Sequence, residues 1–220
     1  MRSFGMFLLA LLWVTLTAAP AHADGPGAFR PPARPAAAPV ISELRAIEAY
    51  NLGYAAIQRA DHAQALAEAT SDPQEKKQSQ SAARKAFEES LQHFQEAVRL
   101  DASMHEAFTY LGYANRKLGR HSEALQAYGR ALSINPDYPH AIEYQGQAFL
   151  GLNRIDDARF NYLRLYALDK RQAGKLLQAM QSWVATHNGA QLKDIDVNAF
   201  ADWVARRIEL TRNDPVSSGW

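Results

Sequence analysis

A 34-residue repeat constrains the fold of this chain more than any other feature of its sequence. Residues of the same kind recur at this spacing: Gly112 with Gly146, Leu118 with Leu152, Ala124 with Ala158, Tyr128 with Tyr162, and Ile134 with Leu168. A period of this length, with small residues at fixed places, is the signature of stacked helix-turn-helix units. The chain is therefore expected to be all-α. Stacked helices form a surface that grips another chain more often than they form a catalytic centre.

Two copies of the repeat are clear, over residues 105–138 and 139–172. In the first copy, small residues stand where two helices must cross closely, and larger apolar residues fill the space between neighbouring helices. A proline ends the unit because it cannot continue a helix. The residues that carry this pattern are Phe108, Leu111, Gly112, Leu118, Ala124, Tyr128, Ala131 and Pro136. At these positions the copy resembles the tetratricopeptide repeat family.

The second copy keeps the pattern less completely. Leu165 stands where the family has a small residue, and Lys170 stands where it has the terminal proline. Terminal units of repeat arrays are commonly atypical, so these departures leave open whether a further repeat follows. The positions that do match are Gly146, Phe149, Leu152, Ala158 and Tyr162.

An earlier copy precedes these two and is interrupted. Phe94 and Ala97 lie one period before their counterparts in the next copy. Gly53, however, lies 59 residues before Gly112, which is 25 residues more than one period. The first repeat, over residues 42–104, therefore resembles the family but contains an insertion of about 25 residues between its conserved halves.

Local signals predict that this insertion is helical. Ser42 is expected to cap the first helix of the repeat. Asp72, Pro73 and Glu75 indicate the start of the second helix, with Asp72 as the cap and Glu75 closing a capping box. The insertion would then lengthen both helices of one hairpin. The alternative is a disordered loop over residues 61–81.

Residues 1–23 have the features of a secretory signal peptide. Arg2 is followed by an apolar run from Phe4 to Leu16, and small residues lie before the expected cleavage site after Ala23. The run is shorter than the roughly 20 residues that span a bilayer, so we expect a periplasmic or secreted protein. The alternative is an uncleaved signal that anchors the chain in the inner membrane. The Pro- and Ala-rich residues 24–41 are expected to form a disordered linker.

Composition excludes several classes of function. Without its signal peptide the chain has 23 basic and 23 acidic residues, and a near-neutral protein is a poor binder of nucleic acid or of an anionic membrane. The absence of cysteine excludes disulfides, thiolate metal sites and a lipoprotein anchor. Asp156 and Asp157 are expected to cap a helix. No nucleophile elbow, phosphate loop or dinucleotide-binding glycine pattern is present, so we expect no catalytic residue, metal or cofactor.

Two further helices are expected over residues 173–211, with a frayed tail over 212–220. Asp196 is positioned to cap the second of them. Both helices carry apolar residues at helical spacing, which indicates a pair that covers the exposed face of the last repeat. The alternative places Trp183 or Trp203 in a binding site.

The resemblance implies a right-handed superhelix of α-solenoid type, here with a lengthened first hairpin and a C-terminal helical cap. In this family the first helices of successive repeats line a concave groove. Carried over by position, the groove residues are Tyr50, Tyr54, Ile57, Thr109, Tyr113, Arg116, Glu143 and Gln147. The residues that define the repeat itself are Gly53, Phe94, Ala97, Leu111, Gly112, Ala124, Tyr128, Ala131, Pro136, Gly146, Ala158 and Tyr162. The alternative is that Tyr50 or Tyr113 only packs against the long hairpin.

We therefore predict an exported adaptor or scaffold that binds an extended or helical segment of another protein in its groove, without catalysis. A clamp for a C-terminal carboxylate is not expected, because the matching positions hold Tyr54, Tyr113 and Gln147. One alternative is a structural protein that self-associates and organises an envelope assembly. Another is an accessory subunit of an envelope enzyme or of a secretion or pilus-type complex. The expected partner is another protein or a second copy of this chain, with no nucleic acid and no stable membrane insertion after signal cleavage.

Overall fold

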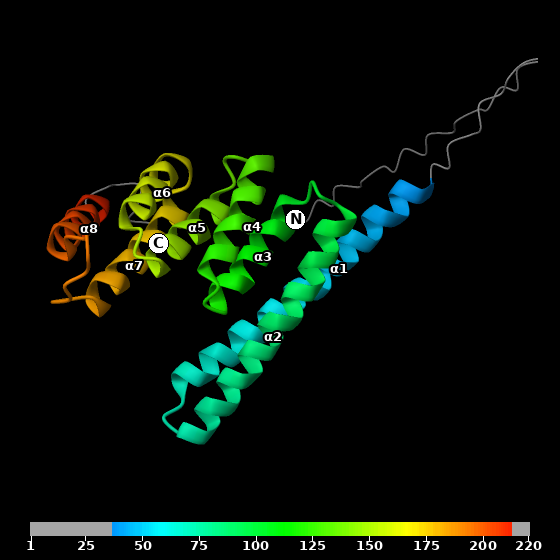
Figure 1. Cartoon of the computed structure of the whole chain (residues 1–220), viewed down its shortest axis with the longest axis horizontal. Coiled ribbons are helices and arrows are strands. Elements are labelled where there is room, and N and C mark those ends of the chain that lie inside the picture. Colours follow the sequence, from blue (N-terminus) through cyan, green and yellow to red (C-terminus); the bar gives the residue numbers. More distant parts are fainter. Residues whose placement is uncertain (1–36, 213–220) are drawn as a thin grey trace, which may run out of the picture. The chain divides into compact units, whose positions relative to one another are not determined.

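The computed structural model describes residues 37–212, and within this range the chain folds into eight α-helices (Figure 1). Their bounds are α1 Ala37–Ala69, α2 Pro73–Leu100, α3 His105–Lys117, α4 His121–Ile134, α5 Pro139–Gly151, α6 Ile155–Leu168, α7 Lys170–Thr186 and α8 Val197–Arg212. The expected all-helical repeat stack is confirmed. The signal peptide over residues 1–23, most of the expected linker and the tail beyond Arg212 lie outside the described residues. None of the helices described is long and apolar enough to cross a membrane.

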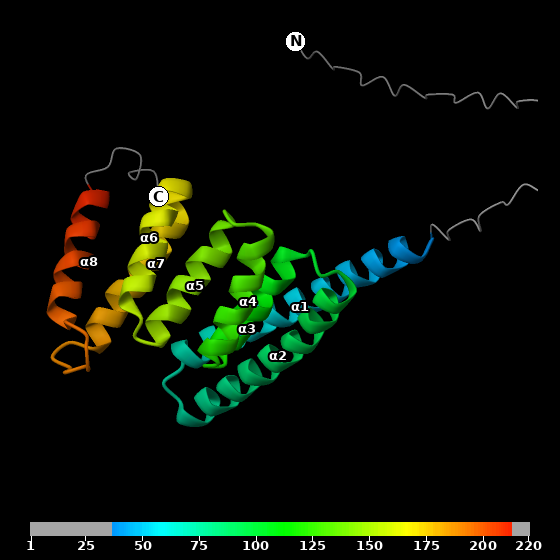
Figure 2. The same cartoon turned by 45° about the horizontal axis from the view of Figure 1, so that its top comes forward.

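The helices pack as successive hairpins. α1 packs on α2, α3 on α4 and α5 on α6, and each hairpin contacts the next one along the chain. α7 then contacts both α5 and α6, and α8 contacts α7. Figure 2 shows α3 to α8 following one another in space in the order of the sequence. This order is the arrangement that a 34-residue helical repeat predicts.

Close helix crossings explain why glycine recurs at its fixed position. A Cβ added to Gly112 would lie 2.5 Å from the ring of Tyr128, and one added to Gly53 would lie 2.9 Å from the ring of Phe94. Both rings are fully buried. Each glycine therefore leaves room for an aromatic ring of the second helix in the same hairpin, as the sequence predicts.

The first hairpin is longer than the others because the insertion is helical. α1 has 33 residues and α2 has 28, and the turn between them projects past the ends of α3 and α4 (Figure 1). Asp72 caps α2, since its Oδ1 accepts from the N–H groups of Gln74 and Glu75 at 2.8 Å each. Glu75 does not close a capping box; its carboxylate accepts from the Thr70 hydroxyl at 2.8 Å. The alternative of a loop over residues 61–81 is wrong, because only residues 70–72 interrupt the helices there.

The start of α1 corrects two expectations. The helix begins at Ala37, so residues 37–41 of the expected linker are helical. Ser42 lies inside the helix and does not cap it. Its hydroxyl donates instead to the carbonyl oxygen of Leu100, at 3.1 Å. Ser42 thus ties α1 to the end of α2, which is a tertiary contact that local sequence signals do not reveal.

The C-terminal pair completes the core. Leu176 of α7 is fully buried, and it occupies the space that Gly146 of α5 leaves open. Trp183 is buried at 7% exposure and donates through Nε1 to Asn153, at 3.2 Å. Trp203 is half-buried and packs edge-on against Tyr162, with ring centroids 5.4 Å apart. The expectation that α7 and α8 cover the last repeat fits this packing.

Of the helix caps predicted near the end of the chain, only one is present. Asp196 caps α8, because its Oδ1 accepts from the N–H of Ala199 at 2.9 Å. Asp156 and Asp157 do not cap α6. They lie in its first turn and pair with arginines of the same helix end, Arg159 and Arg154, where negative charge favours the helix dipole.

Candidate protein-binding surface

Tyrosines from three successive first helices form one continuous surface. They are Tyr50 and Tyr54 of α1, Tyr110 and Tyr113 of α3, and Tyr144 of α5, here called the tyrosine surface. Ring centroids lie 5.2 Å apart for Tyr54 and Tyr110, 6.4 Å for Tyr110 and Tyr113, and 5.0 Å for Tyr113 and Tyr144. Distances in this range are those of stabilising aromatic pairs. The rings therefore hold each other in place across α1, α3 and α5.

Arg116 adds a positive charge to this surface. Its guanidinium lies 5.1 Å from the ring centroid of Tyr113 and 5.6 Å from that of Tyr144, within the range of cation–π attraction. Within the described part of the chain no carboxylate forms an ion pair with Arg116, and its Nε is buried without a hydrogen-bond partner. The positive charge of Arg116 is therefore not neutralised by an ion pair, while the side chain keeps partial exposure.

Tyr113 connects the tyrosine surface to the long hairpin. Its hydroxyl donates to Asp61 of α1, at 2.8 and 2.9 Å from the two carboxylate oxygens, and its ring lies 6.3 Å from that of Phe87 in α2. Burial raises the pKa of Tyr113, and the nearby Asp61 raises it further. Tyr50 is half-buried, and burial raises its pKa to about 12. Both tyrosines stay protonated near neutral pH and act as hydrogen-bond donors or as apolar area.

Three of the eight predicted groove residues cannot contact a partner directly. Ile57 is 3% exposed, Thr109 is 0% exposed and Glu143 is 1% exposed. Each lies on the side of its helix that faces a neighbouring helix. The Thr109 hydroxyl is also occupied, because it donates to the carbonyl oxygen of His105 at 2.8 Å. Carrying groove residues over from the family by position therefore includes residues that are buried in this structure.

The other five predicted residues remain accessible. Tyr54 is 38% exposed, and partial exposure is retained by Tyr50, Tyr113, Arg116 and Gln147. Tyr113 packs on the long hairpin, as the alternative predicts, and it is also partly exposed on the tyrosine surface; its role in binding stays a prediction.

Sequence reasoning missed Tyr110 and Tyr144. Tyr110 lies at the centre of the cluster, in contact with the rings of Tyr50, Tyr54 and Phe94 as well as Tyr113. A signal for both was present, because Tyr110 and Tyr144 are themselves 34 residues apart. Each directly follows a position that was assigned to the groove and is buried.

Glu143 lies beneath the tyrosine surface as a buried carboxyl group. Burial raises its pKa, while a hydrogen bond donated by Gln147 and the charges of Arg116 and Lys175 act in the opposite direction. Its role is structural, since the side chain is almost fully enclosed. Across residues 37–212 no group of three or more His, Asp or Glu side chains is arranged to hold a metal ion.

The raised pKa of Glu143 predicts a pH-dependent stability. Between the unfolded pKa and the raised folded pKa, the folded state binds more protons, so the free energy of unfolding falls as pH rises. Glu143→Gln keeps an acceptor for Gln147 and removes this titration. We expect the variant to flatten the decline of stability that begins as the pH rises above the ordinary pKa of a glutamate, about 4.3, in denaturant unfolding. Parallel pH profiles for the two proteins would contradict the assignment.

A stack of helical hairpins with an aromatic face on its first helices defines a protein of helical-repeat type. The family model described as "Tetratricopeptide repeat" matches residues 105–138, which contain α3 and α4. This part of the chain is therefore similar to a tetratricopeptide repeat. Families of this type act mainly as non-catalytic scaffolds that bind other proteins.

Curated relatives match over a wider part of the chain. The "Hsp70-Hsp90 organising protein" of Plasmodium falciparum is 31% identical over 129 residues, which cover 59% of this chain and 47% of that protein. The protein of the same name from isolate 3D7 has the same identity, with 21% of its length covered. The chain thus spans less than half the length of these relatives. Among solved structures, that titled "Crystal structure of MamA" aligns with a TM-score of 0.42 and 20% identity over 59% of this chain and 77% of that one.

Proposed function

We propose that this protein is an exported, non-catalytic adaptor that binds a segment of another protein on the tyrosine surface. The observation that carries the proposal is the continuity of partly exposed tyrosines across α1, α3 and α5, with Arg116 in cation–π range of two of the rings. Tyrosine offers a large contact area at low entropic cost and has a polar tip, which suits it to protein interfaces. The signal-like residues 1–23 support the exported location.

The geometry favours a segment that crosses several helices. The rings are supplied by three helices that follow one another in the stack, so a bound chain would run across the helix axes. Apolar side chains of the segment would lie between tyrosine rings, and Arg116 would donate a hydrogen bond to an oxygen atom of the partner. A short extended or helical peptide satisfies these requirements.

Replacing Tyr54 and Tyr113 together by Ala tests this surface. A photo-crosslinking residue at Gln147 should trap a discrete partner in cells, and the double variant should reduce the trapped species by about tenfold or more, the effect expected for interface hot spots. The matched control is Phe160→Ala, which removes an aromatic side chain that is 67% exposed on α6. Undiminished trapping by a folded double variant would reject the tyrosine surface as the binding site. Light scattering on the purified proteins supplies the oligomeric state.

Self-association is a second candidate role, favoured by one feature of α1. A row of large apolar side chains is exposed on this helix, comprising Val40, Ile41, Leu44, Ile47 and Leu52. Among the described residues, no helix precedes α1 to cover this row. The same face of a second copy would cover this row in a symmetric contact. A concentration-independent monomer in the light-scattering control would exclude this role.

A further inference from the structure

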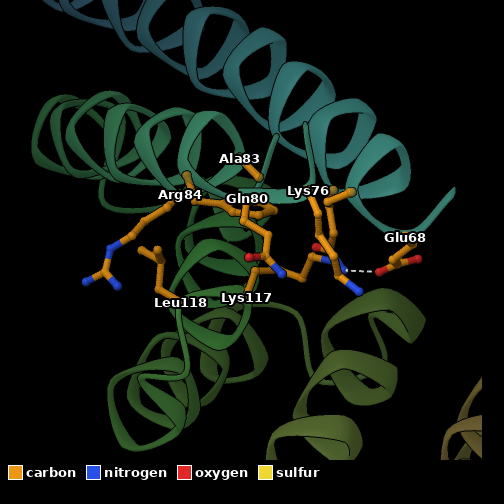
Figure 3. A pocket seen from close by; sticks show the side chains of 10 residues that line it. Glu68, Lys76, Gln80, Ala83, Arg84, Lys117 and Leu118 are labelled. Atoms are coloured by element: carbon orange, nitrogen blue, oxygen red, sulfur yellow. Dashed lines mark hydrogen bonds between the residues drawn. The ribbon is translucent and has the colours of Figure 1, made fainter. Parts of the chain in front are cut away.

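A cleft lies on the long hairpin and adjoins the tyrosine surface at Tyr113, whose ring is close to Phe87 and Lys117 of the cleft lining. Its volume is about 440 Å³, and its lining comes from the C-terminal half of α1, the N-terminal half of α2 and the end of α3. Most of this lining belongs to the insertion that lengthens the first hairpin. Figure 3 shows Arg84 at one end of the cleft and Glu68 and Lys76 at the other, with Gln80 and Lys117 between them.

The cleft has an apolar floor. Ala67, Ala83 and Phe87 are almost fully buried beneath it, and Leu118 adds apolar area at the end of α3. Polar side chains form its rim. A mixed lining of this kind, within the size range of ligand sites, suits a ligand that brings both an apolar group and a charge.

The charge of the rim is positive. Lys76 and Arg84 are exposed, and neither forms an ion pair with another residue among those described. Lys117 is held more tightly: its Nζ lies 3.7 Å from Asp61 Oδ1 and 5.6 Å from the centroid of the Phe87 ring. Glu68 is the one acidic residue that lines the cleft, and its carboxylate accepts from Gln64 at 2.8 Å. Basic side chains therefore exceed acidic ones, and Lys76 and Arg84 are the pair left without counter-charge.

We propose that this cleft binds an acidic protein segment, with carboxylates beside Lys76 and Arg84 and an apolar side chain on the floor above Phe87. A phosphate group is disfavoured, because no helix N-terminus supplies free N–H groups to the cleft: the first N–H groups of α2 already donate to Asp72. The site goes beyond the tyrosine surface, since it lies on the inserted part of the hairpin. The proposal for this cleft depends on the proposed function in one respect, which is that the bound ligand is a protein.

Charge reversal on α2 tests the proposal. The probe is a short fluorescein-labelled peptide of Glu, Leu and Ala, with Glu and Leu on one helical face, titrated with the full chain at low and at physiological ionic strength. Fluorescence anisotropy should show binding that weakens with salt. Lys76→Glu combined with Arg84→Glu should weaken it by about tenfold or more. A peptide with Lys in place of Glu should not bind.

The matched control is Lys77→Glu combined with Lys85→Glu, which changes the net charge equally on the same helix but away from the cleft. Equal weakening by both pairs of substitutions would overturn the proposal, because it would indicate non-specific attraction. Displacement of the peptide by inorganic phosphate would reassign the cleft to a phosphate ligand. Loss of binding in Tyr54→Ala but not in the Lys76 and Arg84 double variant would place the peptide on the tyrosine surface, which would reject this cleft and leave the proposed function intact.

Discussion

Replacing Tyr128 by Ala should destabilise the protein by about 3–5 kcal/mol, the range measured for large aromatic-to-alanine changes in protein cores. The side chain is fully buried and fills the crossing of α3 and α4 beside Gly112. The loss is a large fraction of the 5–15 kcal/mol typical of a folded domain. Thermal unfolding followed by circular dichroism should show a midpoint lowered on the order of 10 °C.

The hydroxyl group of Tyr128 provides the control for this prediction. It is buried close to Arg116 but is not aligned for a hydrogen bond with any described residue; burial raises the pKa of the side chain, and Arg116 acts in the opposite direction. Tyr128→Phe removes only this unsatisfied group, so its stability should equal or exceed that of the wild type. A phenylalanine variant as unstable as the alanine variant would show that the hydroxyl, and not the ring, holds the crossing together.

A double-mutant cycle with Gly112 locates the effect at the crossing. Gly112→Ala alone places a Cβ 2.5 Å from the Tyr128 ring and should cost about 1–3 kcal/mol through overpacking. When Tyr128 is already Ala, the same Cβ meets open space, and alanine is the better helix former by about 0.5–1 kcal/mol. The second substitution should therefore become neutral or stabilising. Additive losses would indicate that the two residues do not share one space.

The hairpins were predictable because the repeat restricts residue size. Gly112 must be small and Tyr128 large for one helix to cross another at that point. The same residue types recur 34 residues later as Gly146 and Tyr162, although Leu176 of α7 fills the space beside Gly146. That the insertion is helical was predictable from a local sequence signal. Asp72 followed by Pro73 starts a helix whatever the surroundings are.

The binding surface was less predictable because exposure depends on neighbouring helices. Thr109 and Glu143 occupy groove positions of the family, yet here their helices turn them inward. Tyr110 and Tyr144, the residues directly after them, reach the surface instead. The cleft beside Phe87 could not be predicted from local patterns at all, since it exists only where the lengthened hairpin meets the end of α3.

The second large effect is expected at the junction of the stack with its C-terminal pair. Leu176→Ala should destabilise the protein by about 2–5 kcal/mol, because a fully buried leucine would leave a cavity between α5 and α7. The matched control is Leu210→Ala on α8, where the side chain is 57% exposed and the loss should stay within about 0.5 kcal/mol.

Two probes of unfolding then show whether α7 and α8 unfold together with the stack or independently of it. Trp183 and Trp203, the tryptophans among the described residues, report on α7 and α8, whereas circular dichroism reports on all helices. Because Leu176, Tyr162 and Trp183 belong to one buried cluster, both probes should shift together in Leu176→Ala, to the same lower denaturant midpoint. If the fluorescence transition alone moved, α7 and α8 would be an independently unfolding appendage. Coincident transitions would instead make the pair a structural part of the stack, since each unit in a repeat array is stabilised by its neighbour.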